Sequence, residues 1–293
     1  MDKLIITVSP TGNVPTKELN PHTPVTPAEI AADVAKCRNA GAALAHFHAR
    51  DAAGNPTCDR MAYKGVVDAV KAAGLDVIVQ LSTGARGGGS TAEWRGQMLD
   101  LGIEMASLAT GSSNFPGSVN ANSPELIEYL AERMYSNGVK PEIEAFDLGM
   151  IDNARALLKR GVLKGPLHFN LVMNVPGSVA GTPRNLVHMV ESLPEGSTWT
   201  VSGIGRSQIQ MLTMAIVMGG HARTGLEDVL YMSRGVLATN EALVQRIANI
   251  ARAVCREIAT PEEARGILGL ASSLQAPGSS LGGMGSLERS RHR

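Results

Sequence analysis

Two histidines separated by one residue, His46 and His48, are the first residues of the sequence whose types and spacing could do chemistry. They close the segment Leu44-Ala45-His46-Phe47-His48, which has the alternation of a β-strand. Side chains two apart on a strand share a face, so both imidazoles could bind one Zn2+ or a similar divalent ion. Histidines that are satisfied by hydrogen bonds in the core or at the surface fit the same spacing. The pattern alone therefore leaves a metal site and a structural pair both open.

A second polar segment reads His221-Ala222-Arg223-Thr224-Gly225-Leu226-Glu227-Asp228 and brings an arginine and two carboxylates within six residues. We expect it to form a strand end and the loop that follows. One carboxylate could complete a two-histidine, one-carboxylate metal set, and the other could then act as a general base. Adjacent acids that stand alone are more often a solvated loop face.

A glycine-rich segment, Gln80 to Gly89, follows another apolar run. The hydroxyls of Ser82 and Thr83, the backbone N–H groups around Gly84 and the side chain of Arg86 could hold a carboxylate or an oxyanion. The segment lacks the ending of a nucleotide-binding P-loop, and a mobile loop with an exposed arginine is the alternative interpretation. The segment Ser202-Gly203-Ile204-Gly205-Arg206 is a secondary candidate, for a phosphate.

Two acids, Glu142 and Glu144, alternate along a further predicted strand. A barrel interior does not tolerate two acids on one face without a cation, and Arg223 is the obvious partner. Such a pair could be structural only. His168, which alternates with Asn170, is interpreted as a core histidine rather than a third metal ligand.

The elements that must position these side chains follow a regular rhythm of short apolar runs and longer segments of helical periodicity. The predicted strands span residues 4–8, 43–48, 77–81, 105–109, 140–146, 166–172, 198–202 and 221–224. The predicted helices span residues 27–40, 61–73, 91–101, 124–137, 151–160, 184–192, 208–218 and 240–258, and capping-box patterns mark residue 27 and a last short helix from residue 261.

Eight strand–helix units without a linker predict an α/β fold of one domain, a (β/α)8 TIM barrel, with a doubly wound sheet as the second choice. Active sites of such barrels lie at the carboxyl ends of the strands. The acids of the segment from His221 to Asp228 would then lie opposite His46 and His48, which favours a functional role for them.

The composition of the chain limits the kinds of partner and the cellular location that we expect. The chain has 293 residues with 27 basic and 27 acidic side chains, so neither nucleic acid nor an anionic membrane is an expected partner, and a small molecule is. The cysteines form no CxxC pattern and no signal sequence is visible, which predicts a reducing, cytoplasmic location. We expect a catalytic domain over residues 1–271 and a flexible Gly/Ser-rich tail over 272–293.

Taken together, the segments resemble the β-keto acid cleavage enzymes, from about Ile5 to Leu270. The motifs that carry the resemblance are Thr7-Val8-Ser9-Pro10-Thr11-Gly12, Pro24-Val25-Thr26-Pro27, His46-Phe47-His48-Ala49-Arg50-Asp51, Gln80-Leu81-Ser82-Thr83-Gly84, Pro141-Glu142-Ile143-Glu144, Val201-Ser202-Gly203-Ile204-Gly205-Arg206 and Gly219-Gly220-His221-Ala222-Arg223-Thr224-Gly225-Leu226-Glu227-Asp228. The resemblance implies a TIM barrel, a homotetramer, and a reaction of a β-keto acid with acetyl-CoA that gives acetoacetate and a new acyl-CoA.

The resemblance also implies roles for single residues. Zinc would be held by His46, His48 and Glu227. Asp228 would remove a proton from C2 of the keto acid, supported by a relay through Arg223 and Glu144. Ser82 and Ser107 match positions that contact the substrate carboxylate, and Ser107 stands where a threonine is expected.

One departure concerns the substrate. In the family enzyme that acts on an amine-bearing keto acid, a glutamate in the first loop contacts the amine, but this chain reads Thr11-Gly12-Asn13-Val14. The loss of that counter-charge in a desolvated site can amount to a few kcal/mol, so we expect an uncharged or anionic keto acid. Arg86 could pair with a second carboxylate.

Two other functions compete with acyl transfer. A metal-dependent hydrolase of the amidohydrolase type also has an HxH pair, but there the pair ends the first strand, and here it ends the second. A non-catalytic metal-binding or scaffold protein is disfavoured, because polar side chains such as Ser82, Glu144 and Arg223 would be an unexplained cost at one barrel end.

Overall fold

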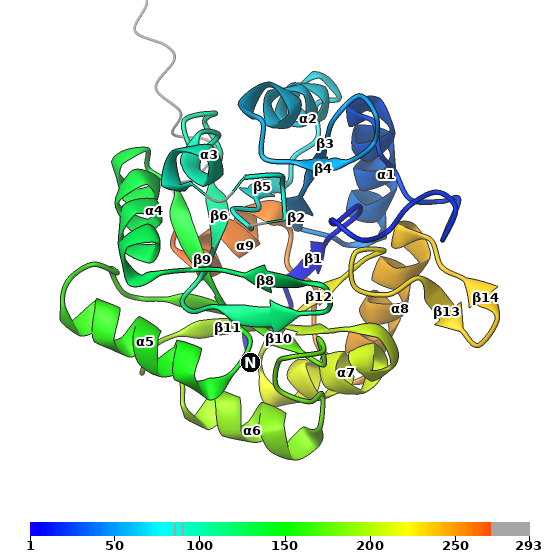
Figure 1. The fold of residues 1–293 in the computed structure, drawn as a ribbon. Helices are drawn as coiled ribbons and strands as arrows, with labels where there is room; N and C mark the ends of the chain where they lie inside the picture. The colour runs from blue at the N-terminus through cyan, green and yellow to red at the C-terminus, as the bar shows by residue number, and fades with distance from the viewer. Residues whose placement is uncertain (85, 90, 271–293) are drawn as a thin grey trace, which may run out of the picture.

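The computed structural model describes residues 1–84, 86–89 and 91–270 of the chain. In this part, eight parallel strands close into a barrel in the order β1-β12-β11-β10-β9-β6-β5-β2 (Figure 1). The barrel strands are β1 (Ile6–Val8), β2 (Leu44–Phe47), β5 (Ile78–Leu81), β6 (Met105–Ala109), β9 (Lys140–Ala145), β10 (His168–Met173), β11 (Thr198–Gly203) and β12 (His221–Thr224). The predicted single-domain TIM barrel is confirmed, and a doubly wound sheet is excluded. The predicted tail of residues 272–293 lies outside the described residues.

A helix follows each barrel strand, and the helices form the outer ring in Figure 1. They are α1 (Pro27–Ala40), α2 (Arg60–Ala72), α3 (Ala92–Gly96), α4 (Pro124–Ser136), α5 (Leu148–Lys159), α6 (Pro183–Glu191), α7 (Gln208–Met218) and α8 (Asn240–Ala253), with a 3-10 turn η1 (Gly205–Ser207) before α7. The predicted capping box at α1 is present, since the side chains of Thr26 and Glu29 each accept from the other's backbone N–H. The predicted helix 91–101 is shorter than expected, because α3 ends at Gly96.

The amino end of the barrel is filled by a last helix, α9 (Pro261–Leu268), which begins with the second predicted capping box. Its Ala264 and Leu268 belong to a buried cluster with Ile5, Leu44 and Ile78. Ile5 directly precedes β1, and Leu44 and Ile78 are the first residues of β2 and β5. Burial of this apolar surface stabilises the closed end. Ligands must therefore enter at the carboxyl ends of the strands.

Three short hairpins extend the loops at the carboxyl ends within the described residues. They are β3–β4 (Ala49–Arg50 with Pro56–Thr57), β7–β8 (Ser113–Phe115 with Ser118–Asn120) and β13–β14 (Tyr231–Ser233 with Val236–Leu237). β7–β8 lies across the front of the barrel in Figure 1. The sequence did not predict these hairpins, because strands of two or three residues are too short to show an alternation.

The middle of the barrel is polar rather than apolar. The register of β9, β10 and β11 sets Glu142 beside His168, and His168 beside Thr198. His168 Nε2 lies 3.3 Å from a Glu142 carboxylate oxygen, and its Nδ1 lies 2.8 Å from the Thr198 hydroxyl. His168 is thus a buried histidine with partners in the core, as the sequence suggested. Across the described residues, no helix combines the length and the apolar character needed to cross a membrane.

Candidate active site

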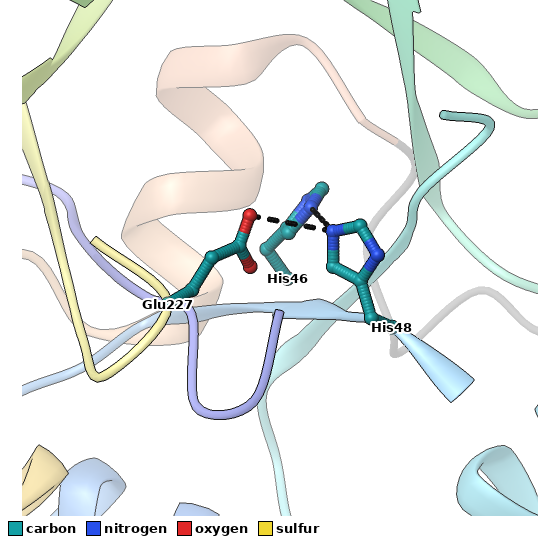
Figure 2. A group of neighbouring side chains, drawn as sticks. All are labelled: His46, His48 and Glu227. Carbon is teal, nitrogen blue, oxygen red and sulfur yellow. Dashed lines mark hydrogen bonds and ion pairs between the residues drawn. The ribbon is translucent and has the colours of Figure 1, made fainter. Parts of the chain in front are cut away.

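His46, His48 and Glu227 converge at the carboxyl rim of the barrel (Figure 2). His46 lies on β2, His48 directly follows it, and Glu227 comes from the loop after β12. The Nε2 atoms of the two histidines are 3.2 Å apart, and His48 Nε2 is 3.3 Å from Glu227 Oε1. The potential ligand atoms of all three residues lie within 4.8 Å of one another. Two imidazoles and one carboxylate at this spacing can hold a divalent metal ion.

The state of each side chain fits a metal ligand. His46 Nδ1 lies 2.6 Å from the Gln80 side-chain oxygen, so Nδ1 carries the proton that this oxygen accepts, and Nε2 keeps its lone pair. Burial, together with the positive charge of Arg223, lowers the pKa of His46 to about 4 and keeps the ring neutral. Glu227 Oε2 is buried without a hydrogen-bond partner among the described residues, which leaves an acceptor for a cation.

The buried guanidinium of Arg223 lies between two carboxylates. Its Nη2 donates to Glu227 at 2.6 Å and to Asp228 at 2.9 Å, while its Nε donates to the other Asp228 oxygen at 3.2 Å. Ser9 donates a further hydrogen bond to Asp228 at 2.9 Å. These donors fix the orientation of the Asp228 carboxylate.

The two carboxylates respond differently to the same surroundings. Burial penalises the charge of Glu227, but Arg223 and His48 outweigh it and hold the pKa of Glu227 well below its usual range. Burial raises the pKa of Asp228, and the neighbouring charge of Glu227 adds to this effect. Glu227 therefore stays deprotonated, whereas Asp228 is the carboxylate that accepts a proton more readily.

Glu144 approaches Arg223 as predicted, but Glu142 does not. Arg223 Nη1 lies 3.7 Å from Glu144 Oε1, whereas Glu142 pairs with His168. Burial raises the pKa of Glu144 to about 8, although Arg223 opposes the rise. Glu142 lies deeper in the barrel than Glu144, so its partner comes from the next strand.

Ser82, Gly84 and Arg86 of the glycine-rich loop line a cavity of about 590 Å³ that also contains His48 and the carboxylates of the rim. The guanidinium of Arg86 lies over the ring of Phe115, 4.4 Å from its centre. The cavity wall also includes apolar side chains, among them Phe146 and Val172. The cation of Arg86 thus lies in a cavity whose wall is partly apolar.

Thr83 and Ser107 are engaged with each other. The Thr83 hydroxyl donates to the Ser107 carbonyl at 2.6 Å, and the Thr83 N–H donates to the Ser107 hydroxyl at 3.4 Å. Neither residue is among those that line the cavity in the described part of the chain. They join the loop after β5 to β6, and a contact with substrate stays a prediction for both.

Several residues that shape the site were missed in the sequence. Arg50 donates to the carbonyls of Gly12 and Pro15 and so fixes the first loop, while buried Arg95 donates to the Thr83 carbonyl at 2.6 Å. Gly12 has a φ of +63°, and a Cβ on it would lie 2.5 Å from Glu227 Cγ. Arg50 stands in the His46–Asp51 motif, but no periodicity or spacing identifies its partners.

A family model described as beta-keto acid cleavage enzyme matches residues 3–270, and the chain belongs to this family. It is 45% identical over 272 residues to a 3-keto-5-aminohexanoate cleavage enzyme of Fusobacterium nucleatum subsp. nucleatum, over 92% of this chain and 99% of that protein. It is 40% identical to a 3-oxoadipate:acetyl-CoA acetyltransferase of Cupriavidus necator, over 92% and 95% of the two chains. The apo structure of ObcA shares the fold, with a TM-score of 0.73 and 22% identity over 85% of this chain and 66% of that one.

Proposed function

We propose that the protein converts a β-keto acid and acetyl-CoA into acetoacetate and a new acyl-CoA. Membership of the family and the names of relatives that act with acetyl-CoA support this reaction. The observation that carries it is the meeting of a metal-ligand set with a separate buried carboxylate, Asp228, held by Arg223 and Ser9. A base beside a Lewis-acid site is what removal of a proton next to a carbonyl requires. The position of His46 and His48 at the end of β2, the second barrel strand along the chain, favours this reaction over amidohydrolase chemistry.

The metal that we propose is zinc, held by His46, His48 and Glu227. Bound there, it would act as a Lewis acid that polarises the keto and carboxylate oxygens of the substrate. Gln80 keeps His46 in the tautomer that a ligand needs. Arg223 balances the negative charge of Glu227 at 2.6 Å.

Asp228 is the base of the proposed reaction, and it takes the C2 proton of the keto acid. C2 then attacks the thioester carbon of acetyl-CoA, and the CoA thiolate leaves. The thiolate attacks the original keto carbon, the bond from that carbon to C2 breaks, and Asp228 returns the proton to acetoacetate. Arg223 and Glu144 support the Asp228 carboxylate, and the hydroxyl of Ser82 is available to the substrate carboxylate.

The acyl side of the substrate would carry an anionic end. Arg86 brings a positive charge over Phe115 into the cavity, and the first loop presents Val14 rather than a carboxylate to it. A relative named for 3-oxoadipate, which has two carboxylates, is 40% identical to this chain. A dicarboxylic β-keto acid combines these features, since its second carboxylate can pair with Arg86.

A cytoplasmic homotetramer is the proposed assembly and location. Exposed apolar side chains on α7 and β14, among them Val217 and Val236, offer surface that a neighbouring subunit could cover. The relatives are named as metabolic enzymes, which is consistent with a cytoplasmic location.

The test is a panel of amine-bearing, neutral and dicarboxylic β-keto acids, each given with acetyl-CoA to zinc-loaded protein, with acetoacetate as the readout. We expect acetoacetate with a preference for the dicarboxylic acids, and a kcat lower by ~10²-fold or more in Asp228→Asn. Arg86→Ala should raise KM for dicarboxylic acids and leave neutral ones unchanged. No acetoacetate from any member of the panel, with the metal bound, would overturn the proposed function.

A further inference from the structure

A second cavity, of about 690 Å³, adjoins the first one at the rim. Val14, Ile204, Glu227 and Asp228 line both cavities, so the two spaces meet at the proposed metal ligand and base. The second cavity continues outward between the loop after β11 and the hairpin β13–β14. The keto acid does not need this space, because the first cavity already holds Ser82 and Arg86.

We propose that this second cavity binds coenzyme A, with its phosphates against Arg206, Arg234 and Arg246 and its pantetheine arm directed to Asp228. The inference rests on the proposed function, because the reaction needs a thioester beside the base. It assigns a role to the segment from Ser202 to Arg206, which the sequence indicated as a candidate phosphate site. Gly205 and Arg206 of this segment line the second cavity and not the first one.

The charge of the cavity fits a polyanion. Arg206, Arg234 and Arg246 all line it, and within the described residues none of the three is in an ion pair with a carboxylate. The two acids on the wall, Glu227 and Asp228, both pair with the buried Arg223, at 2.6 and 2.9 Å. Coenzyme A carries a diphosphate and a 3′-phosphate, and arginine matches phosphate geometry with paired donors.

Buried donors on the wall lack partners. Gln208 is 1% exposed, lines the cavity, and has no hydrogen-bond partner for its side-chain nitrogen in the described part of the chain. Arg246 Nε is buried and equally unpaired, although the rest of its guanidinium donates to the Met232 carbonyl and the Gln208 side-chain oxygen, both at 2.8 Å. Buried donors without acceptors are costly, and a ligand with phosphate and amide oxygens supplies acceptors.

The remaining wall suits the neutral parts of the same ligand. Tyr231 is 48% exposed and Ile209 is 39% exposed, and both line the cavity together with Val229 and Leu230. An exposed tyrosine offers a face on which an adenine can stack, and aliphatic side chains can cover a pantetheine arm. The wall of the second cavity therefore combines arginine side chains with apolar side chains.

The two sites are coupled through the backbone. The N–H of Gly205 donates to the carbonyl of Asp228 at 2.8 Å, and Gly205 has a φ of +61°. The loop that would carry phosphate contacts is thus hydrogen-bonded to the residue that would act as base. A ligand bound along this loop would therefore lie next to Asp228.

The experiment is isothermal titration of the whole protein with CoA and with adenosine 3′,5′-bisphosphate, for wild type, Arg206→Ala, Arg234→Ala and the double variant. We expect Kd for CoA to rise by ~10-fold or more in each single variant, since each loses charge-assisted contacts, and further in the double variant. The exposed Arg184 on α6 lies outside the cavity, so Arg184→Ala is the matched control with an unchanged Kd. In turnover, KM for acetyl-CoA should rise while KM for the keto acid stays constant.

The outcomes separate this inference from the proposed function. Unchanged Kd for CoA in the double variant, or no binding of CoA to wild type, would overturn the CoA site even if acetoacetate is formed. Binding that the arginine variants lose, in a protein that makes no acetoacetate from any keto acid, would support the site and refute the function. A change of oligomeric state in Arg234→Ala without a change in Kd would assign the hairpin to a subunit contact and would also overturn the inference.

Discussion

Gln80 shows how a residue without reactive chemistry can control the candidate metal centre. Its oxygen fixes the His46 tautomer, although its own nitrogen is buried without a partner in the described structure. The register of β2 and β5 sets His46 directly beside Gln80, so the contact is built into the barrel. A side chain that orients a ligand in this way usually changes metal affinity more than it changes the fold.

We predict that Gln80→Ala weakens zinc binding by ~10- to 100-fold, because His46 loses the acceptor that holds its Nδ1 proton. Competition with a chromogenic chelator measures the affinity, and thermal unfolding of the metal-free protein checks the fold. Gln210→Ala, a change on the exposed face of α7, is the control and should bind zinc like wild type. An unchanged zinc affinity in Gln80→Ala would refute the positioning role.

Among single residues, the sequence indicated the candidate metal ligands but not the residues that orient them. His46, His48 and Glu227 come together as the spacing and the family resemblance indicated. The contacts of Gln80 and Ser9 depend on which strands become neighbours and in which register, and a single sequence does not state these pairings.

Among the elements, the first loop and the hairpin β3–β4 act as one unit through Arg50. Its guanidinium donates to the carbonyls of Gly12 at 2.7 Å, Pro15 at 2.8 Å and Gly54 at 3.0 Å. Val14, which lines both cavities, lies between two of these anchor points. Arg50 therefore holds the wall that the two proposed substrates share.

We expect Arg50→Ala to lower the free energy of unfolding by ~1–3 kcal/mol, because buried carbonyls lose their donor. The freed first loop should raise KM for the keto acid more than it lowers kcat. Steady-state kinetics and denaturant unfolding give both quantities, and Arg50→Lys should restore only part of each. Wild-type KM in a folded Arg50→Ala protein would show that the loop needs no such anchor.

The elements themselves were predictable to the extent that they are long. Helices with an apolar face leave a period in the sequence, and the barrel strands lie in apolar runs of several residues, so the barrel was predicted unit by unit. α3 was expected to reach residue 101 but ends at Gly96, where a Cβ would lie 3.3 Å from the ring of Tyr129. Glycine has a low helix propensity, and the apolar periodicity that continues to residue 101 does not show this local preference.

For the molecule as a whole, the polar barrel interior sets a dependence of stability on pH. His221 is buried and accepts the N–H of Ile5 through Nδ1 at 3.1 Å. Burial, together with the nearby His168 and Arg256, lowers its pKa to about 3. Between this value and the unfolded pKa of about 6.5, the unfolded chain binds a proton that the native protein does not.

The free energy of unfolding should therefore fall as the pH drops below about 6.5, with a contribution from His221 of up to ~1.4 kcal/mol per pH unit. We predict that His221→Gln, which keeps an acceptor but cannot be protonated, has a shallower fall between about pH 6.5 and about pH 4.5. Urea unfolding of the metal-free proteins at several pH values measures the slopes. Parallel slopes for the two proteins would exclude His221 as a source of acid sensitivity.

The seam of the barrel joins distant parts of the chain, because Ile6 on β1 pairs with Ala222 on β12, and Leu4 bridges to Ile258 just before α9. Because the chain is synthesised from its N-terminus, β1 leaves the ribosome long before β12 has been made. Contacts of such long sequence separation form late and slowly. During synthesis, the strand that precedes the first loop of the site therefore has one unpaired edge, accessible to chaperones and prone to aggregation, until β12 has been made.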